Sequence, residues 1–556
     1  MKRIVTLFVV IVFACSATIA QTAFEKNTGE YGELFTSLSN MLQTKNELIF
    51  DVTLRGKKYK LLVPWIRDHV HVMKAMKYFM KDASSGTQLF LDQQTPQGFF
   101  YDYIYPIQSD IINRVNYFQP RFIKLFPGDK WQMHRVPVEA DVEYLVVEGV
   151  YAAWQSTGDT AFIRKWIPAM EKAMNYVKSD TIRWSKQYQL VKRGYTIDTW
   201  DFQFLPYSRQ EYSKRYGDPS QGIMDVKDTT FMGVMHGDNS GMYAACRQLA
   251  NMYKVTGNEG MSNVWNKEAE LYQARANALL WNGKYYKHFL PDGPLPPYIT
   301  FDIQNQLSLS NPYDINRGLP TEQMAESIIQ SYIDIREKEK GNTFAEWYSL
   351  YPYVNPDWAG HEGGTYVNGG ILIVTAGELA KAAFQHGYEN YGADILSRIN
   401  NLVQKNNGLL YACYKPDGKP DGGLPDAWAQ AAVFSAMVEG LAGVVDKTAL
   451  FEKVELSPRW LAAGKDEASV TIAYGPSGKK VSYDYTHNKR SKSFLLKING
   501  DAKEYTVRML LPAGVKKARA TVNRKNVSVV YETLRNSTYA VISGIKVASP
   551  ACQVMY

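Results

Sequence analysis

The stretch YAAWQSTGDTAFIRKWIPAMEKAMNYV (residues 151–177) contains the unit that most of this 556-residue chain repeats. A helix of small and apolar residues runs up to a Gly-Asp turn, and an amphipathic helix follows it. The same layout returns at residues 243–281 and at residues 378–403. Helical hairpins repeated in this way predict either an open solenoid or a closed ring.

The segments between the hairpins favour the ring. They are long, irregular and rich in Trp, Gly, Asp and Asn, as in residues 192–238 and 355–370. A solenoid would join its units by short and uniform turns. Loops gathered at one end of a ring can instead build a pocket.

The chain changes character on both sides of the hairpins. From about residue 450, short alternating runs broken by Gly, Asn and Ser predict antiparallel strands. Before the hairpins, ELIFDVTLRGKKYKLLV predicts one β-hairpin that turns at RGKK. We therefore predict a mainly α fold with a lead-in segment (21–61), a barrel of hairpins (62–446) and a small C-terminal antiparallel β-sandwich (447–556).

The first twenty residues predict a secretory signal peptide. Lys2 and Arg3 precede an apolar run of about eleven residues, which is too short to span a bilayer. Cleavage after Ala20 would release a soluble periplasmic or secreted protein. The alternative is a lipoprotein anchored through Cys15.

Composition narrows the possible partners. The net charge of +8 is modest and the basic residues are dispersed, so no nucleic-acid partner is predicted. Aromatic residues make up 13% of the chain, which suits a site that grips sugars, although a tyrosine-rich core explains part of that density. The four cysteines form no C-x-x-C pattern, and Cys246 and Cys413 are expected to be buried thiols. His69 and His71 should point to different sides of a helix, so no metal or organic cofactor is predicted.

Five polar and aromatic segments precede predicted helix starts and supply Asp, Glu, Arg or His. In a closed ring these segments would converge on one face. Asp68, Asp141 and Asp238 could each instead cap a helix N-terminus. The segments cover residues 64–73, 135–145, 195–204, 233–242 and 356–370.

Two of these segments carry the acids suited to catalysis. In YTIDTWDFQF (195–204), Asp201 lies between Trp200 and Phe202, and aromatic surroundings raise a carboxyl pKa toward that of a proton donor. Glu362 in GHEGG has small neighbours that leave room for water and a sugar. Asp198 competes with Asp201 for the role of the acid.

The ring and its loops resemble the (α/α)6-barrel, or six-hairpin, glycosidases. TWDFQF is similar to the Trp-Asp-Phe motif of the trehalase and processing α-glucosidase families, and HEGGTYVNGGI resembles their late loop. PWIRD is similar to a sugar-binding turn of debranching enzymes. The resemblance implies an inverting glycoside hydrolase with Asp201 as general acid and Glu362 as general base. The glutamate before trehalase's Trp-Asp is absent, and only Arg209 follows the motif, which argues against a true trehalase.

The other polar and aromatic residues of these loops are expected to bind the carbohydrate. An α/α-toroid polysaccharide lyase, a non-catalytic glycan-binding protein and a sugar epimerase are the alternatives. The expected sugar-binding residues are Trp65, Arg67, Asp68, Glu139, Asp141, Asp198, Trp200, His236, Asp238, Trp358, His361, Tyr366 and Asn368.

Overall fold

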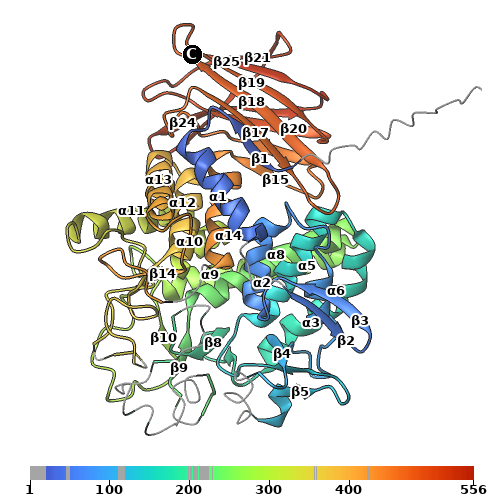
Figure 1. Cartoon of the computed structure of the whole chain (residues 1–556), viewed down its shortest axis with the longest axis vertical. Coiled ribbons are helices and arrows are strands. Elements are labelled where there is room, and N and C mark those ends of the chain that lie inside the picture. The colour runs from blue at the N-terminus through green and yellow to red at the C-terminus, as the bar shows by residue number, and fades with distance from the viewer. Residues whose placement is uncertain are drawn as a thin grey trace, which may run out of the picture.

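A helical body lies beneath a β-domain in the computed structural model (Figure 1). The predicted signal peptide and Cys15 lie outside the described residues. Within the described part, no helix combines the length and the apolarity needed to cross a bilayer. The structure describes residues 21–44, 50–109, 119–197, 200, 203–204, 211, 214, 224–227, 230–355, 357–358, 360–422 and 426–556.

The helical body is a closed ring. Among the described residues, six inner helices each pack on the next, and the last packs back on the first. The predicted ring is confirmed, and an open solenoid is excluded. The inner helices are α2 (Ile66–Met76), α5 (Val142–Thr157), α8 (His236–Val255), α10 (Ser310–Arg317), α12 (Ile373–Gln385) and α14 (Ala427–Ser435).

Outer helices cover this ring, and the three predicted hairpins are the pairs α5–α6, α8–α9 and α12–α13. The first hairpin shows how local chemistry makes the turn. Gly158 ends α5 in the left-handed region (φ 71°), and the Asp159 carboxylate accepts the Phe162 amide at 2.9 Å to begin α6. The outer helices are α1 (Glu30–Thr44), α3 (Ser85–Leu91), α6 (Thr160–Ser179), α9 (Glu259–Leu280), α11 (Glu322–Lys338) and α13 (Glu389–Lys405).

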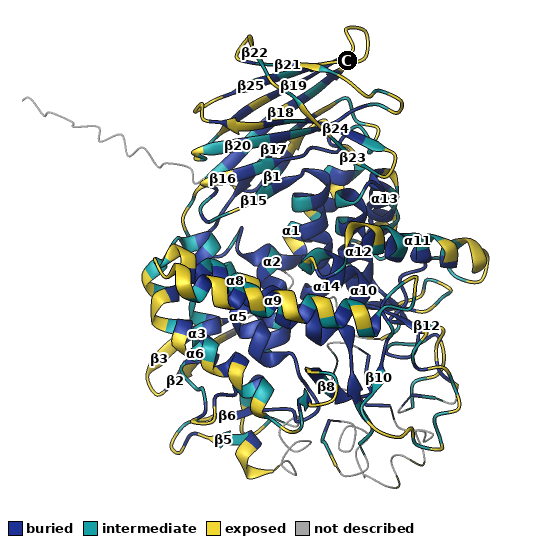
Figure 2. Ribbon diagram, turned by 180° about the vertical axis from the view of Figure 1, so that it is seen from behind, coloured by how far each residue is buried: buried dark blue, intermediate teal, exposed yellow. Residues whose placement is uncertain are grey.

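Burial separates the two layers of helices. Figure 2 shows an exposed stripe along α9, whereas the ribbon of α5 behind it is mostly buried. The inner helices therefore lack the wide polar face of a surface helix, and their polar residues need partners inside the protein.

The β-domain contains a seven-stranded and a five-stranded sheet, so the description of the fold as mainly α was too narrow. Side chains along β18 alternate between buried and exposed, which is the pattern that predicted these strands. In sheet order the strands are β1 (Ala23–Lys26), β17 (Glu467–Ala473), β18 (Lys480–Asn488), β19 (Ser493–Gly500), β25 (Ala551–Met555), β21 (Arg519–Val522) and β22 (Lys525–Val527), and then β15 (Val444–Asp446), β16 (Lys453–Leu456), β20 (Glu504–Leu510), β24 (Ser537–Ile545) and β23 (Val530–Leu534).

The lead-in segment is more than the predicted hairpin. Its hairpin exists as β2 (Phe50–Leu54) and β3 (Lys57–Leu61). Before it, β1 pairs with β17 of the β-domain, where Ala23 lies opposite Thr471, and α1 packs on α13 and α14. The segment thus belongs structurally to both parts of the protein, and the exact domain boundaries stay a prediction.

Short sheets form in the barrel loops, at the end far from the β-domain (Figure 1). Two of them have three and four strands, and the others pair two strands. Their strands are β4 (Tyr103–Pro106), β5 (Ile123–Leu125), β6 (Trp131–His134), β7 (Trp184–Ser185), β8 (Leu190–Gly194), β9 (Met232–Val234), β10 (Leu290–Pro291), β11 (Leu307–Ser308), β12 (Leu350–Tyr351), β13 (Ile371–Leu372) and β14 (Cys413–Tyr414).

The close approach of α12 to α14 makes a prediction about stability. A Cβ atom at Gly377 would lie 2.5 Å from the Ala432 carbonyl carbon of α14, so Gly377→Ala should lower the free energy of unfolding by about 1–3 kcal/mol. At Gly260 of α9 the nearest atom is 3.6 Å away, so Gly260→Ala should raise it by about 0.5–1 kcal/mol. Urea unfolding of both variants tests this, and equal effects would refute the packing argument.

Candidate active site

The five polar and aromatic segments that precede inner helices lie at one end of the barrel. Residues near the C-terminal ends of several inner helices, such as Lys77, Gln155 and Arg317, line a single cavity beneath the β-domain. The inner helices therefore run in the same direction, and their N-termini meet at the opposite end, beside the short loop sheets (Figure 1).

Three of the predicted loops are shorter than expected, because α2, α5 and α8 begin inside them. Helix α2 begins at Ile66 and α8 at His236, so Arg67 and Asp68, like His236 and Asp238, lie in first helical turns. Asp141 occupies the N-cap position of α5, yet its side chain makes no capping hydrogen bond. The capping interpretation of Asp141 is therefore wrong.

Arg67 gathers the acids at the start of α5. Its Nη1 donates to Glu139 Oε1 at 2.7 Å and lies 3.8 Å from Asp141 Oδ2. All three side chains are buried, and neither Asp141 oxygen has a hydrogen-bond partner within the described part of the chain. The Arg67 guanidinium also lies 5.9 Å from the ring of Trp65, which stacks on Tyr103. The structure thus brings four predicted site residues together.

A second buried carboxyl lies beside this group. Asp102 Oδ2 accepts the Val136 amide at 2.7 Å, and burial raises the pKa of Asp102 to about 6. Burial also raises the pKa of Glu139 well above its usual range, against the opposing charge of Arg67. The charge of Asp102 raises the pKa of Glu139 further, so a proton on one of these two buried carboxyls is favoured.

Trp200 links the loop at residues 195–204 (the early loop) to the loop at residues 356–370 (the late loop). Its indole Nε1 donates to the Tyr366 hydroxyl at 2.9 Å, and its carbonyl accepts a hydrogen bond from Arg193. Arg193 in turn lies 3.4 Å from Asp238 of α8. Asp198 and Asp201 lie outside the described residues.

Hydrogen bonds made by its own residues hold the late loop in its conformation. The Asn368 side chain bonds the amide and carbonyl of Val354 and the carbonyl of His361, so it holds the loop together. The His361 ring centroid lies 5.2 Å from that of Tyr366. Glu362 is exposed at the surface of this loop. A Cβ atom at the next position, Gly363, would lie 2.3 Å from the ring of Tyr353, so the tyrosine would have to move to admit a side chain there.

Some expected sugar ligands lie behind the surface of the site. Trp358 is fully buried and stacks on Tyr195, with ring centroids 5.2 Å apart. His236 is buried, with Nδ1 2.5 Å from Asp314 Oδ2 and Nε2 2.8 Å from Ser308 Oγ. These contacts make both side chains part of the supporting wall. Asp68 is half-buried in the first turn of α2.

The sequence analysis did not single out the residues at the start of α14, the last inner helix. The Trp428 ring stacks on Trp200 at 5.4 Å, and its Nε1 donates to the Tyr313 hydroxyl at 2.8 Å. Asp426 caps α14 by accepting the Trp428 amide at 2.7 Å. The sequence PDAWAQAA (425–432) places an acidic and an aromatic residue at the start of a helix, as the five segments singled out do. The same pattern could therefore have identified it.

No group of three or more His, Cys, Asp or Glu side chains within the described ranges could hold a metal ion. His69 and His71 do point to different sides: His69 Nδ1 accepts the Leu62 amide at 3.2 Å, whereas His71 stacks on Trp428 at 4.6 Å. Cys246 and Cys413 are buried thiols, as predicted.

Comparisons with known proteins identify the fold. No protein-family model and no curated protein matches the sequence. The α-L-rhamnosidase of Dictyoglumus thermophilum matches with a TM-score of 0.57 and 12% identity over 96% of this chain and 51% of that one. A GH78 family rhamnosidase of Bacillus SP. GL1 matches with a TM-score of 0.55 and 14% identity over 89% and 43%. A structure described as a sialidase matches with a TM-score of 0.54 and 13% identity over 94% and 41%.

The chain thus spans about half or less of the length of these structures and shares their fold, including the β-domain. At such low identity the likeness concerns architecture alone. It supports the fold of a glycoside hydrolase and does not bear out the narrower resemblance to the trehalase group.

The buried carboxyl pair predicts a pH-dependent stability. The folded-state pKa of Asp102 is about 6, above its ordinary value of 3.8, so the folded protein binds this proton more tightly than the unfolded chain. Stability from this group is therefore full below pH 4 and is lost as the pH rises through 6, by about 2–3 kcal/mol. Asp102→Asn should remove that loss, so the variant should gain stability over wild type between pH 4 and pH 7.

Urea unfolding at several pH values measures this difference. Asp51→Asn, at a carboxyl with 73% of its side chain exposed, is the control and should follow the wild-type curve. A gap between Asp102→Asn and wild type that stays constant with pH would contradict the assignment.

Proposed function

We propose that this protein is a glycoside hydrolase that inverts the anomeric centre of an oligosaccharide or a glycan end. The observation that carries the proposal is the hydrogen bond from Trp200 to Tyr366. It joins the loop that holds Asp201 to the loop that holds Glu362, at the end of the barrel where the inner helices begin. Proteins described as rhamnosidases share this architecture.

The two acids suit opposite roles. Asp201 lies between Trp200 and Phe202 in the sequence, and aromatic neighbours favour a protonated carboxyl. Glu362 is exposed and followed by Gly363, which leaves room for the water molecule that a general base positions. An inverting pair needs a separation of about 6.5–9.5 Å to admit that water, against about 5–5.5 Å in a retaining enzyme.

The surrounding residues would position the sugar. Arg67 and Asp141 lie at the starts of α2 and α5, and His361 and Tyr366 supply polar rings in the late loop. Proton transfer and positioning by these side chains require no metal or organic cofactor. Secretion to the periplasm or beyond, with a lipid on Cys15 as the alternative, belongs to the same proposal.

Substitution of the two acids tests the mechanism. Asp201→Asn and Glu362→Gln should each lower turnover by about 10²–10⁴-fold, because each removes one proton-transfer group while keeping its shape. Asp357→Asn, in the same loop as Glu362, is the matched control and should stay within a few-fold of wild type. Sugar release from an oligosaccharide panel is the measurement, with unfolding midpoints to confirm intact folding.

Two further outcomes would change the assignment. If Asp198→Asn abolishes activity and Asp201→Asn does not, the acid lies three residues earlier. Product that first appears with retained configuration by NMR would replace the inverting mechanism with a covalent one. An unsaturated, ultraviolet-absorbing uronide would instead identify a lyase.

A further inference from the structure

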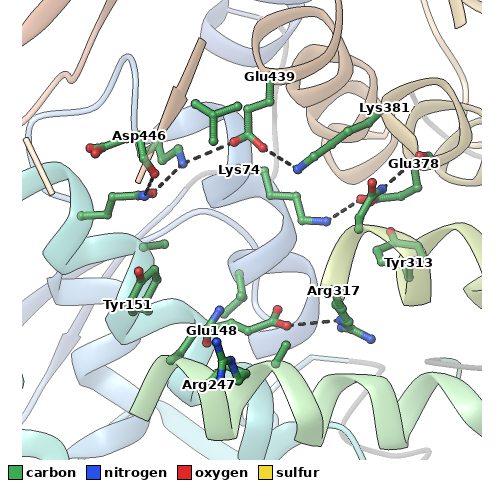
Figure 3. A pocket seen from close by; sticks show the side chains of 18 of the residues that line it. Lys74, Glu148, Tyr151, Arg247, Tyr313, Arg317, Glu378, Lys381, Glu439 and Asp446 are labelled. Carbon is green, nitrogen blue, oxygen red and sulfur yellow. Dashed lines mark hydrogen bonds and ion pairs between the residues drawn. The ribbon is translucent and has the colours of Figure 1, made fainter. Parts of the chain in front are cut away.

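A cavity of about 360 Å³ occupies the rear end of the barrel, opposite the candidate active site. Residues near the C-terminal ends of α2, α5, α10 and α12, together with α8, form its wall, and Asp446 of β15 and Tyr474 lie on the side of the β-domain (Figure 3). Its volume falls within the range of about 300–1,000 Å³ that small-molecule sites occupy. Lys74 and Glu439 keep 28% and 21% of their side chains exposed, so the cavity reaches solvent.

Among the described residues, the cavity wall carries five basic and four acidic side chains, and most of them form ion pairs with one another. Lys74 pairs with Glu378, and Lys381 pairs with Glu439 of the turn that follows α14. On the opposite side Arg317 lies 3.4 Å from Glu148 (Figure 3). A charged ligand would leave one of these pairs uncompensated in a partly buried site. A hydroxyl group can both donate and accept a hydrogen bond and carries no charge. A ligand with hydroxyl groups can therefore bond to both members of these ion pairs without adding a charge to the site.

Several polar side chains of this wall contain an atom without a hydrogen-bond partner among the described residues. Arg317 Nη2, Asn316 Oδ1 and Gln248 Oε1 are buried and lack a hydrogen-bond partner among the described residues. The Arg317 side chain is only 7% exposed, although its Nη1 bonds Gly237 and Ser240. These three atoms expose almost no surface, so they lie behind the cavity wall, and leaving such groups unsatisfied is costly.

Aromatic rings complete the wall. Tyr151 and Tyr313 line it, and the Lys74 ammonium lies 4.7 Å from the Tyr313 ring centroid. Rings beside carboxylates and guanidinium groups can contact the C–H faces of a sugar while the charges bond its hydroxyls. The stacked pair of His71 and Trp428, with Tyr313 at its edge, lies between this cavity and Trp200 of the candidate active site.

From these contacts we propose that the rear cavity is a second carbohydrate site, which binds a neutral polyol the size of a monosaccharide. Its hydroxyls bond the partly exposed Glu148 carboxylate and Lys74 ammonium, and its apolar face contacts Tyr151. The site is separate from the proposed catalytic loops and stands whether or not the hydrolase assignment holds.

Titration calorimetry of the full chain with glucose, mannose and rhamnose tests the proposal. Glu148→Gln should weaken binding of the preferred sugar about 10-fold or more, because it removes a charged acceptor. Arg247→Met, at an exposed residue of the same wall, is the second variant should Glu148→Gln fail to fold, and it should also weaken binding. Asp51→Asn, at an exposed carboxyl outside both sites, should leave this binding unchanged.

A crystal soaked with the sugar that binds shows where it lies, and sugar beside Arg317 supports the proposal. Sodium phosphate and sodium glucuronate serve as the anionic probes. Binding of these anions without the sugars would overturn the neutral class. A rear cavity without sugar at saturating concentration would overturn the site itself, while hydrolytic activity in the same preparation would still support the proposed function.

Discussion

The parallel stacking of His71 on Trp428 joins the first inner helix to the last. The ring centroids are 4.6 Å apart and the planes differ by 1°. Burial holds the pKa of His71 well below its usual range, so the imidazole stays neutral and packs as a flat, nearly apolar plate. Trp428 also contacts Trp200 and donates to Tyr313, so the seam of the ring and the candidate active site share one side chain. A barrel that did not close here would have no common end for its loops.

Local features of the chain were predictable because their chemistry is local. Gly158 and Asp159 end one helix and start the next without help from distant residues, and the alternation along β18 reflects one buried face. The pairing of β1 with β17 depends on a partner more than 400 residues away, and no pattern within β1 reveals it. The start of α2 was misplaced for a different reason. Inner helices are buried all round, so Arg67 interrupts no apolar stripe that could mark the boundary.

In the candidate site, too, the local features could be predicted and the long-range contacts could not. Arg67, Glu139 and Asp141 were singled out as polar residues near helix starts, and helix starts do meet at one end of a closed ring. Sequence could not tell which aromatic or polar side chains face the opening and which support it from behind. Trp358 stacks on Tyr195, and Asn368 bonds its own loop, because three-dimensional packing decides the direction in which each points.

The position of β1 has a consequence for how the molecule would sit on a surface. Ala23 is paired at the edge of the seven-stranded sheet, and the loops of the candidate active site lie at the far end of the barrel (Figure 1). If Cys15 carries the proposed lipid, the anchored chain joins the protein at the β-domain, and the loops of the candidate active site lie at the other end of the molecule.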